Sequence, residues 1–192
     1  MRRLLFLLPL VIALVAVVIV LLTPGEKPNV HLYKGHPKAP EINLRDQYGR
    51  RTSFGGRYII LTFSYTGCPD VGYITVMRIN QSLSLYAPDL LPSGKAEVWV
   101  VTVDPYEDTP QRALEYTKRL ELPFRWLLGN KSDLELVWSA YNITVKYDPT
   151  SGYIAHDVRV YLIDPQGRLV ARIDGVPTME DLKFLYSLIP SS

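Results

Sequence analysis

The sequence predicts an α/β fold, a mixed sheet flanked by helices, preceded by one N-terminal membrane-spanning helix. Three observations support this prediction. Patterns typical of buried strands alternate with patterns typical of helices, a tight turn joins the last two strand patterns, and the first 22 residues are almost entirely apolar. The 192 residues therefore divide into an anchor at 1–22, an extended linker at 23–40 and one folded domain at 41–192.

The N-terminal segment has the length and composition of a transmembrane helix. The run from Leu4 to Leu22 is apolar apart from Pro9, and as a helix it would span roughly 28 Å, close to the thickness of a bilayer core. Arg2 and Arg3 precede it, which favours a cytoplasmic N-terminus. A cleaved signal peptide is the alternative, but its apolar region is shorter and ends in small residues. We expect a single-pass anchor in the cell membrane and an extracytoplasmic domain.

The linker at 23–40 contains four prolines and two glycines and has no apolar period. It also holds His31 and His36, which we expect to be solvated, with transient copper capture as the alternative interpretation. The domain then begins with a short predicted hairpin that turns at residues 46–49.

The elements of the domain follow in order. Residues 58–63 and 98–103 are continuous runs of strand-forming apolar residues, typical of strands buried on both faces. A helix is predicted over 71–85, and Thr109 with Pro110 starts another, as N-cap and first helical residue.

The remaining elements complete the sheet. Ser132 and Glu135 predict a capping box for the next helix, and residues 158–163 and 169–173 predict an antiparallel pair joined by a turn at 164–167. Thr178 and Asp181 predict the start of a final helix. This order describes a mixed sheet with helices on both faces, and a thioredoxin-like arrangement has the same element order.

Composition limits the chemistry. A net charge of +2 without a dense basic stretch argues against a nucleic-acid partner. One cysteine and three histidines exclude a four-cysteine zinc site and a histidine-rich cluster within one chain.

Cys68 is the residue with the strongest local signal. It follows a buried strand and a glycine-containing turn and lies just before a predicted helix, where free amides and the helix dipole favour the thiolate. The alternative is a buried structural cysteine. Asp104, Glu107 and Asp108 also invite a metal or acid–base interpretation, but their position between a strand end and a helix start favours a structural one.

Several separate segments resemble the SCO/SenC family. They are residues 63–71 (FSYTGCPDV), 101–110 (VTVDPYEDTP), 126–130 (WLLGN), and His156 followed by 161–167 (YLIDPQG). Their order and spacing fit from about residue 40 to 189.

The resemblance implies a thioredoxin-like fold that binds copper through two cysteines of a Cys-x-x-x-Cys motif and a distant histidine. By position, Cys68 corresponds to the first cysteine, which would also be the redox-active residue, and His156 to the histidine. The family implies a copper chaperone or assembly factor rather than an enzyme. Its expected partner is membrane oxidase subunit II or another copper protein, reached from the membrane through the N-terminal helix.

This chain departs from the family at the second cysteine, because Gly72 stands four residues after Cys68. Asp70, Asp157 and Met77 are candidates for the missing donor. Two alternatives to copper delivery remain open. One is an exported single-cysteine thiol or peroxide reductase of the same fold, although Tyr65 stands where peroxide reductases carry a threonine. The other is a non-catalytic docking module.

Overall fold

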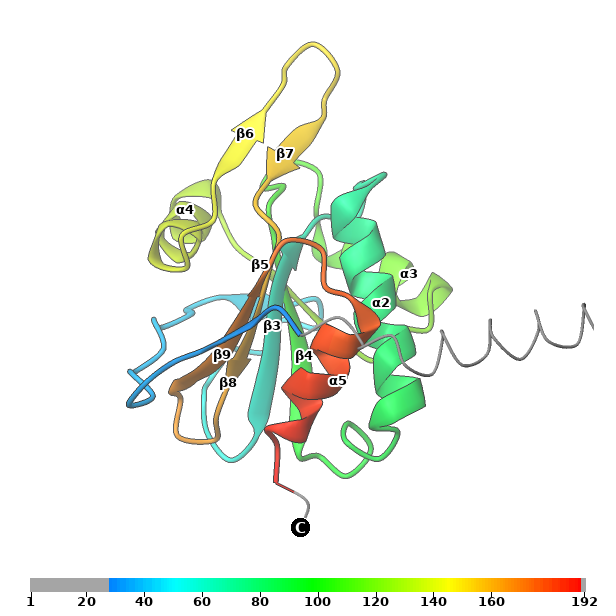
Figure 1. Cartoon of the computed structure of the whole chain (residues 1–192). Coiled ribbons are helices and arrows are strands. Elements are labelled where there is room, and N and C mark those ends of the chain that lie inside the picture. Colours follow the sequence, from blue (N-terminus) through cyan, green and yellow to red (C-terminus); the bar gives the residue numbers. More distant parts are fainter. Residues whose placement is uncertain (1–27, 191–192) are drawn as a thin grey trace, which may run out of the picture.

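A seven-stranded mixed sheet forms the centre of the molecule, and its strands lie in the order β1-β9-β8-β3-β4-β5-β2. The computed structural model describes residues 28–190 (Figure 1). A separate two-stranded hairpin, β6-β7, projects from one end of the sheet. The strands are β1 (Val30–Leu32), β2 (Arg45–Asp46), β3 (Tyr58–Ser64), β4 (Ala96–Thr102), β5 (Arg125–Leu128), β6 (Val145–Tyr147), β7 (Ile154–His156), β8 (Arg159–Ile163) and β9 (Leu169–Asp174).

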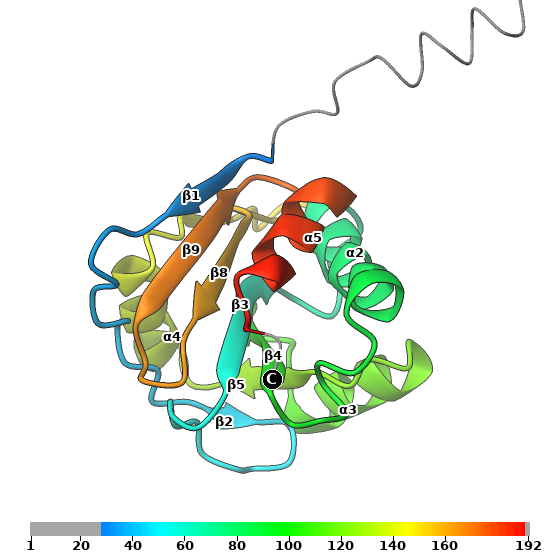
Figure 2. The same cartoon turned by 60° about the horizontal axis from the view of Figure 1, so that its bottom comes forward.

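Helices cover both faces of the sheet, as the sequence predicts. The helices are α2 (Val71–Tyr86), α3 (Pro110–Arg119), α4 (Lys131–Ala140) and α5 (Met179–Ser187). Figure 2 shows α2, α3 and α5 on one side of the sheet and α4 on the other. Each side has its own apolar cluster, because side chains of the central strands alternate between the two faces.

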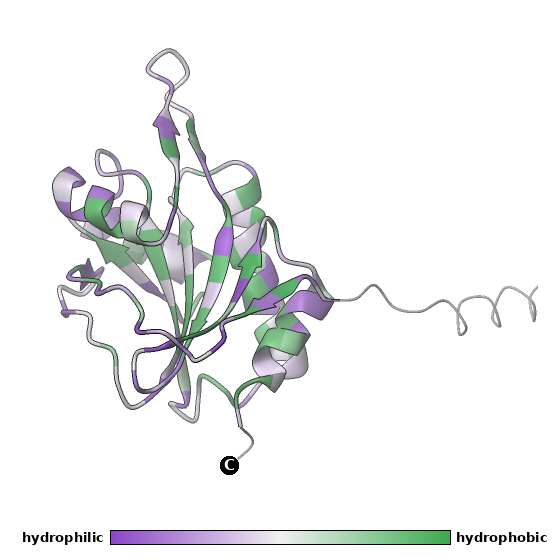
Figure 3. Ribbon diagram, turned by 60° about the vertical axis from the view of Figure 1, so that its left-hand side comes forward, coloured by the Kyte–Doolittle hydropathy of each residue, from purple (hydrophilic) through white to green (hydrophobic). Residues whose placement is uncertain are grey.

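The two central strands, β3 and β4, pair in parallel from Tyr58 with Ala96 to Ser64 with Thr102. In β3, Ile60 packs in the cluster under α2, whereas Ile59 and Leu61 pack in the cluster under α4. Hydrophobic residues follow these strands, and hydrophilic residues gather in the outer loops (Figure 3). A strand buried on both faces needs a continuous apolar run, which explains why the sequence identifies it so clearly.

The local signals at turns and helix ends are largely confirmed. β8 and β9 form the predicted antiparallel pair, and the Thr178–Asp181 capping box starts α5. The predicted Ser132 cap of α4 is wrong. Asn130 is the N-cap and accepts a hydrogen bond from the Asp133 amide, while the Ser132 hydroxyl bonds to the Asn130 side chain. β5 has only four residues, too few for a periodic signal in the sequence.

The region assigned to the linker differs in part from expectation. Val30–Leu32 forms the edge strand β1 and pairs with β9, and Ala39 is buried in the core. Backbone pairing with the edge of an existing strand does not require an apolar period. Three residues of the predicted linker could therefore form a strand that the sequence pattern did not indicate. The predicted anchor at 1–22 lies outside the described residues. Within residues 28–190, no helix has both the length and the apolar character to cross a bilayer.

Candidate metal centre

Cys68 lies in the loop that connects the end of β3 to the start of α2. Its backbone amide donates to the Tyr65 carbonyl (3.1 Å), and its side chain is only 7% exposed. Thr66, two residues before Cys68, is also fixed, because its amide and its hydroxyl both donate to the Asp108 carboxylate. The cysteine is therefore held in a tight, largely buried turn.

Asp108 ties this turn to the neighbouring strands. Besides Thr66, its carboxylate accepts from the Thr102 hydroxyl (2.6 Å) and from the Trp126 indole N–H (3.1 Å), and burial raises its pKa. Asp104 accepts from the backbone amides of residues 106 and 107. Both carboxylates thus have structural partners, which agrees with the structural interpretation of these acidic residues. The link from Asp108 to the cysteine turn was not predicted, because it joins segments that only the folded sheet brings together.

His156 ends β7 and reaches the same place from the projecting hairpin. Its Nδ1 lies 3.0 Å from the Asp157 carbonyl oxygen. Since a carbonyl only accepts, this contact assigns the proton to Nδ1 and leaves the lone pair on Nε2. Burial lowers the pKa of His156, which favours the neutral imidazole. The ring also meets Tyr65 edge-on at 6.2 Å.

Cys68 and His156 converge on Gly72, in the first turn of α2. A Cβ atom at this glycine would lie 2.9 Å from the Cys68 Sγ and 3.1 Å from the His156 Nε2. The separation of sulfur and nitrogen therefore cannot exceed the sum of these distances, about 6 Å. Cys68 and His156 thus lie side by side although 88 positions separate them in the sequence.

The protonation of Cys68 differs from the sequence-based expectation. Burial raises the pKa of the thiol and outweighs the nearby backbone amides of residues 70, 72 and 73, which act to lower it. Desolvation therefore outweighs the effect of the helix N-terminus, and the thiol form is favoured instead of the expected thiolate. The thiol also lies 3.4 Å from the Asp70 Oδ1.

Each of the other predicted donors has contacts of its own. Asp70 accepts a 2.6 Å hydrogen bond from the Tyr153 hydroxyl, and Asp157 accepts from the Thr144 amide. Met77 packs against the apolar cluster on the opposite face of the sheet from Cys68. Among residues 28–190, no three side chains of His, Cys, Asp or Glu converge in a way that could hold a metal ion.

The linker histidines do not join this centre. His31 lies in β1, opposite Arg172 in the register of the sheet edge, and packs edge-on against Tyr33. His36 is exposed, in a loop with φ 44°.

Comparison with known proteins assigns the family. The SCO1/SenC family model matches residues 36–183. The chain belongs to the SCO1/SenC family. An SCO2-like protein of Rickettsia typhi is 30% identical over 176 residues, covering 84% of this chain and 83% of the relative.

Solved SCO structures share the fold. Copper-bound ScoI of Bradyrhizobium japonicum superposes with a TM-score of 0.66 at 26% identity, covering 80% of this chain and 99% of ScoI. Apo Sco1 of Thermus thermophilus gives 0.70 at 21% identity, with 86% and 99% covered. The predicted thioredoxin-like α/β fold is therefore confirmed for this SCO1/SenC member.

Proposed function

We propose that this chain binds copper through Cys68 and His156 and delivers it during assembly of a copper protein, with membrane oxidase subunit II as the expected recipient. One observation carries the proposal. The His156 Nε2 is buried, has no hydrogen-bond partner among residues 28–190, and faces the same point beside Gly72 as the Cys68 sulfur. A buried ring nitrogen without a hydrogen-bond partner destabilises the fold unless a ligand binds to it.

The donor chemistry suits copper. Sulfur and imidazole nitrogen are ligands that copper accepts, and the bond between His156 Nδ1 and the Asp157 carbonyl orients the ring with Nε2 toward the sulfur. Cys68 would lose its proton when the metal binds. The positive charge of the metal would then offset the cost of burying the thiolate. The copper-bound ScoI structure of a protein 26% identical to this chain supports the same cargo.

Transfer to a recipient requires access to the centre. Tyr73 and Ile74, in the first turn of α2, are exposed, and Tyr153 in the hairpin loop is at the border of exposure while bonded to Asp70. We propose that these exposed side chains, near Cys68 in the sequence or through the Asp70 bond, contact the recipient. The predicted anchor at 1–22 would hold the domain at the extracytoplasmic surface of the cell membrane, where we propose that copper is transferred.

The peroxide-reductase alternative receives less support. A peroxide-reactive cysteine needs a lowered thiol pKa, whereas burial raises the pKa of Cys68. The other alternative is a docking module that binds no metal. A copper-binding measurement distinguishes it from the proposal.

The test is a Cu(I) titration of the full chain in detergent, without oxygen and against a chromophoric Cu(I) chelator. We expect one copper ion per chain. Cys68→Ala should abolish binding, and His156→Ala should weaken it by at least about tenfold, because each removes a direct ligand. His31→Ala is the matched control, since it removes an imidazole from the edge strand and should leave binding unchanged.

Absence of binding at micromolar copper, or equal binding by Cys68→Ala, would contradict the proposal and favour the docking module. Peroxide consumption that depends on Cys68 would instead support the reductase.

A further inference from the structure

Three donor atoms, not two, surround the point beside Gly72. A Cβ atom at this glycine would lie 2.5 Å from the Ser64 Oγ, closer than from the Cys68 Sγ (2.9 Å) or the His156 Nε2 (3.1 Å). The three side chains come from the end of β3, the loop before α2 and the end of β7. An oxygen, a sulfur and a nitrogen therefore face one small space.

The Ser64 hydroxyl is also unpaired. Its side chain is 0% exposed, and its Oγ has no hydrogen-bond partner among residues 28–190. Among residues 28–190, three buried side-chain polar atoms have no partner: the Ser64 Oγ, the His156 Nε2 and the Tyr116 hydroxyl, of which the first two face Gly72. Other buried hydroxyls are paired, such as that of Thr62, which donates to the Arg159 carbonyl, and that of Ser82, which bonds to the Tyr186 hydroxyl. Because buried polar groups are nearly always paired, an orphaned hydroxyl beside an orphaned imidazole nitrogen indicates a shared ligand.

No other side chain is placed to complete the centre. The described residues contain no three converging His, Cys, Asp or Glu side chains. The Asp70 Oδ1 lies 3.4 Å from the Cys68 sulfur, but the three atoms nearest to a Cβ at Gly72 are the Ser64 Oγ, the Cys68 Sγ and the His156 Nε2. Within residues 28–190, Ser64 is therefore the third donor nearest to the point where Cys68 and His156 meet.

We propose that the Ser64 hydroxyl is the third donor of this centre and that it directs the centre toward divalent late first-row ions, such as Cu(II) and Zn(II). The inference rests on the proposed function and deepens it. A hydroxyl oxygen is a harder ligand than the thiolate it replaces, so it contributes to binding of a divalent ion and little to binding of Cu(I), which sulfur and nitrogen alone can hold.

The same geometry makes Ser64 and Gly72 a matched pair. A Cβ atom at position 72 would lie 2.5 Å from the Ser64 Oγ, a distance that real Cβ contacts do not reach. A cysteine at position 72 therefore requires that the hydroxyl at position 64 be removed or displaced. The oxygen donor and a second sulfur donor at position 72 therefore compete for the same space.

The first experiment compares two metals on the full chain in detergent. Zn²⁺ serves as a divalent probe that thiols cannot reduce, and Cu(I) is measured as above. Ser64→Ala should lower the Zn²⁺ affinity by about tenfold and the Cu(I) affinity by less than about threefold. Ser82→Ala removes an equally buried hydroxyl from α2 outside the centre and should change neither affinity.

An unchanged Zn²⁺ affinity in Ser64→Ala, or a wild-type chain that binds no Zn²⁺, would overturn the role of Ser64. Cu(I) binding that depends on Cys68 would still stand in that case, so the two proposals fail separately. Loss of Zn²⁺ and Cu(I) affinity by equal factors would also contradict the inference.

The second experiment uses the metal-free chain. Ser64→Ala removes an unpaired hydroxyl and should keep or raise the urea midpoint, whereas Ser82→Ala breaks a buried hydrogen bond and should lower it. A clear loss of stability in Ser64→Ala would show that the hydroxyl has a structural partner and would overturn the proposal.

The third experiment tests the matched pair. Gly72→Cys combined with Ser64→Ala should bind Cu(I) at least about tenfold more tightly than Gly72→Cys alone, because the double variant removes the closest contact of a Cβ at position 72 and leaves only the smaller shift of the Cys68 sulfur (2.9 Å) to be made. Equal Cu(I) affinity of the single and double variants would contradict this competition for space.

Discussion

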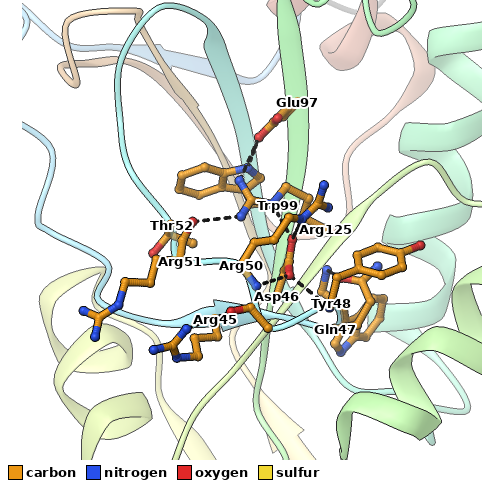
Figure 4. Close-up of polar contacts among 12 residues, drawn as sticks. Arg45, Asp46, Gln47, Tyr48, Arg50, Arg51, Thr52, Glu97, Trp99 and Arg125 are labelled. Carbon is orange, nitrogen blue, oxygen red and sulfur yellow. Dashed lines mark hydrogen bonds and ion pairs between the residues drawn. The ribbon is translucent and has the colours of Figure 1, made fainter.

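Two buried polar clusters in this molecule differ in how completely their hydrogen bonds are made. In the Ser64–Cys68–His156 centre, the serine oxygen and the Nε2 of histidine are buried and unpaired within the described chain. In the second cluster, which we call the Asp46 network, every buried polar side-chain atom has a hydrogen-bond partner within residues 28–190. The Asp46 network consists of Asp46, Arg50, Glu97, Trp99 and Arg125 (Figure 4).

The Asp46 network joins β2, β4 and β5 at the edge of the sheet. Asp46 accepts from the amides of residues 48 and 50 and from the Nε atoms of Arg50 and Arg125. Glu97 accepts from the Trp99 indole and from Arg125. The buried donors and acceptors of this network are thus paired within residues 28–190.

The difference shows how burial of polar groups should be interpreted. A buried cluster whose bonds are complete orders the fold, whereas a buried cluster with unpaired atoms has capacity for a ligand that the protein does not supply. The Asp46 network is therefore expected to govern stability, and the centre at Gly72 to govern metal binding.

The largest effect is expected for Arg125→Met. The Arg125 side chain is 15% exposed and bridges two carboxylates, so its loss leaves buried charge poorly compensated. We expect the free energy of unfolding in urea to fall by about 3 kcal/mol. Copper affinity should not change, because no ligand of the proposed centre contacts Arg125.

Arg57→Met is the control for this variant. Arg57 also pairs with Glu97, but its side chain is 45% exposed, so we expect a loss below about 1 kcal/mol. Equal losses in the two variants, or a marked loss of copper affinity in Arg125→Met, would break the division between the two clusters.

An intermediate effect is expected from acid. Burial opposes ionisation of the Asp46 carboxyl, but hydrogen bonds from Arg50, Tyr48 and Arg125 outweigh it, and the pKa of Asp46 is lowered from 3.8. A lowered pKa in the folded state adds stability that is complete above the unfolded pKa and is lost as the pH falls through the folded one. The stability difference between wild type and Asp46→Asn should therefore be constant at neutral pH and shrink below about pH 4.

Urea unfolding between pH 2 and pH 7 measures this difference, and comparison of the two proteins cancels the contributions of carboxyls they share. A difference that grows toward low pH would show that Asp46 is not held as a carboxylate.

The smallest effect is expected for Arg168→Met, at a turn built in the same way. Residues 46–50 and 164–168 both follow the pattern Asp-x-x-Gly-Arg, and in each turn the arginine Nε contacts the aspartate Oδ2 at 2.8 Å. The Arg168 side chain is 47% exposed, so its loss should cost only about 0.5 kcal/mol in urea unfolding. A cost as large as that of Arg125→Met would show that the turn itself, and not burial, determines the effect.

Much of the fold could be predicted because its signals are local. The apolar runs of β3 and β4, the Asp164 turn and the Thr178 cap each depend on a few neighbouring residues. Errors occurred where local signals compete or where pairing alone decides. Asn130 capped α4 in place of Ser132, and Val30–Leu32 became an edge strand through contact with β9.

The candidate centre could be predicted in part. Cys68 has a local signal in the strand–turn–helix context, whereas His156 was selected only through the resemblance to SCO/SenC proteins. Ser64 had no signal at all, since a serine that ends a strand is ordinary in a sequence. Only the structure reveals that its hydroxyl is buried and unpaired.

By itself, the sequence determined the α/β class, the order of the main elements, the family and the absence of a second cysteine. The tertiary structure alone decided that Ser64, Gly72 and His156 meet at Cys68 and that the thiol is buried enough to raise its pKa. The reason is physical. Periodicity and capping act between near neighbours, but hydrogen-bond completeness and desolvation depend on contacts of a few ångströms between distant segments.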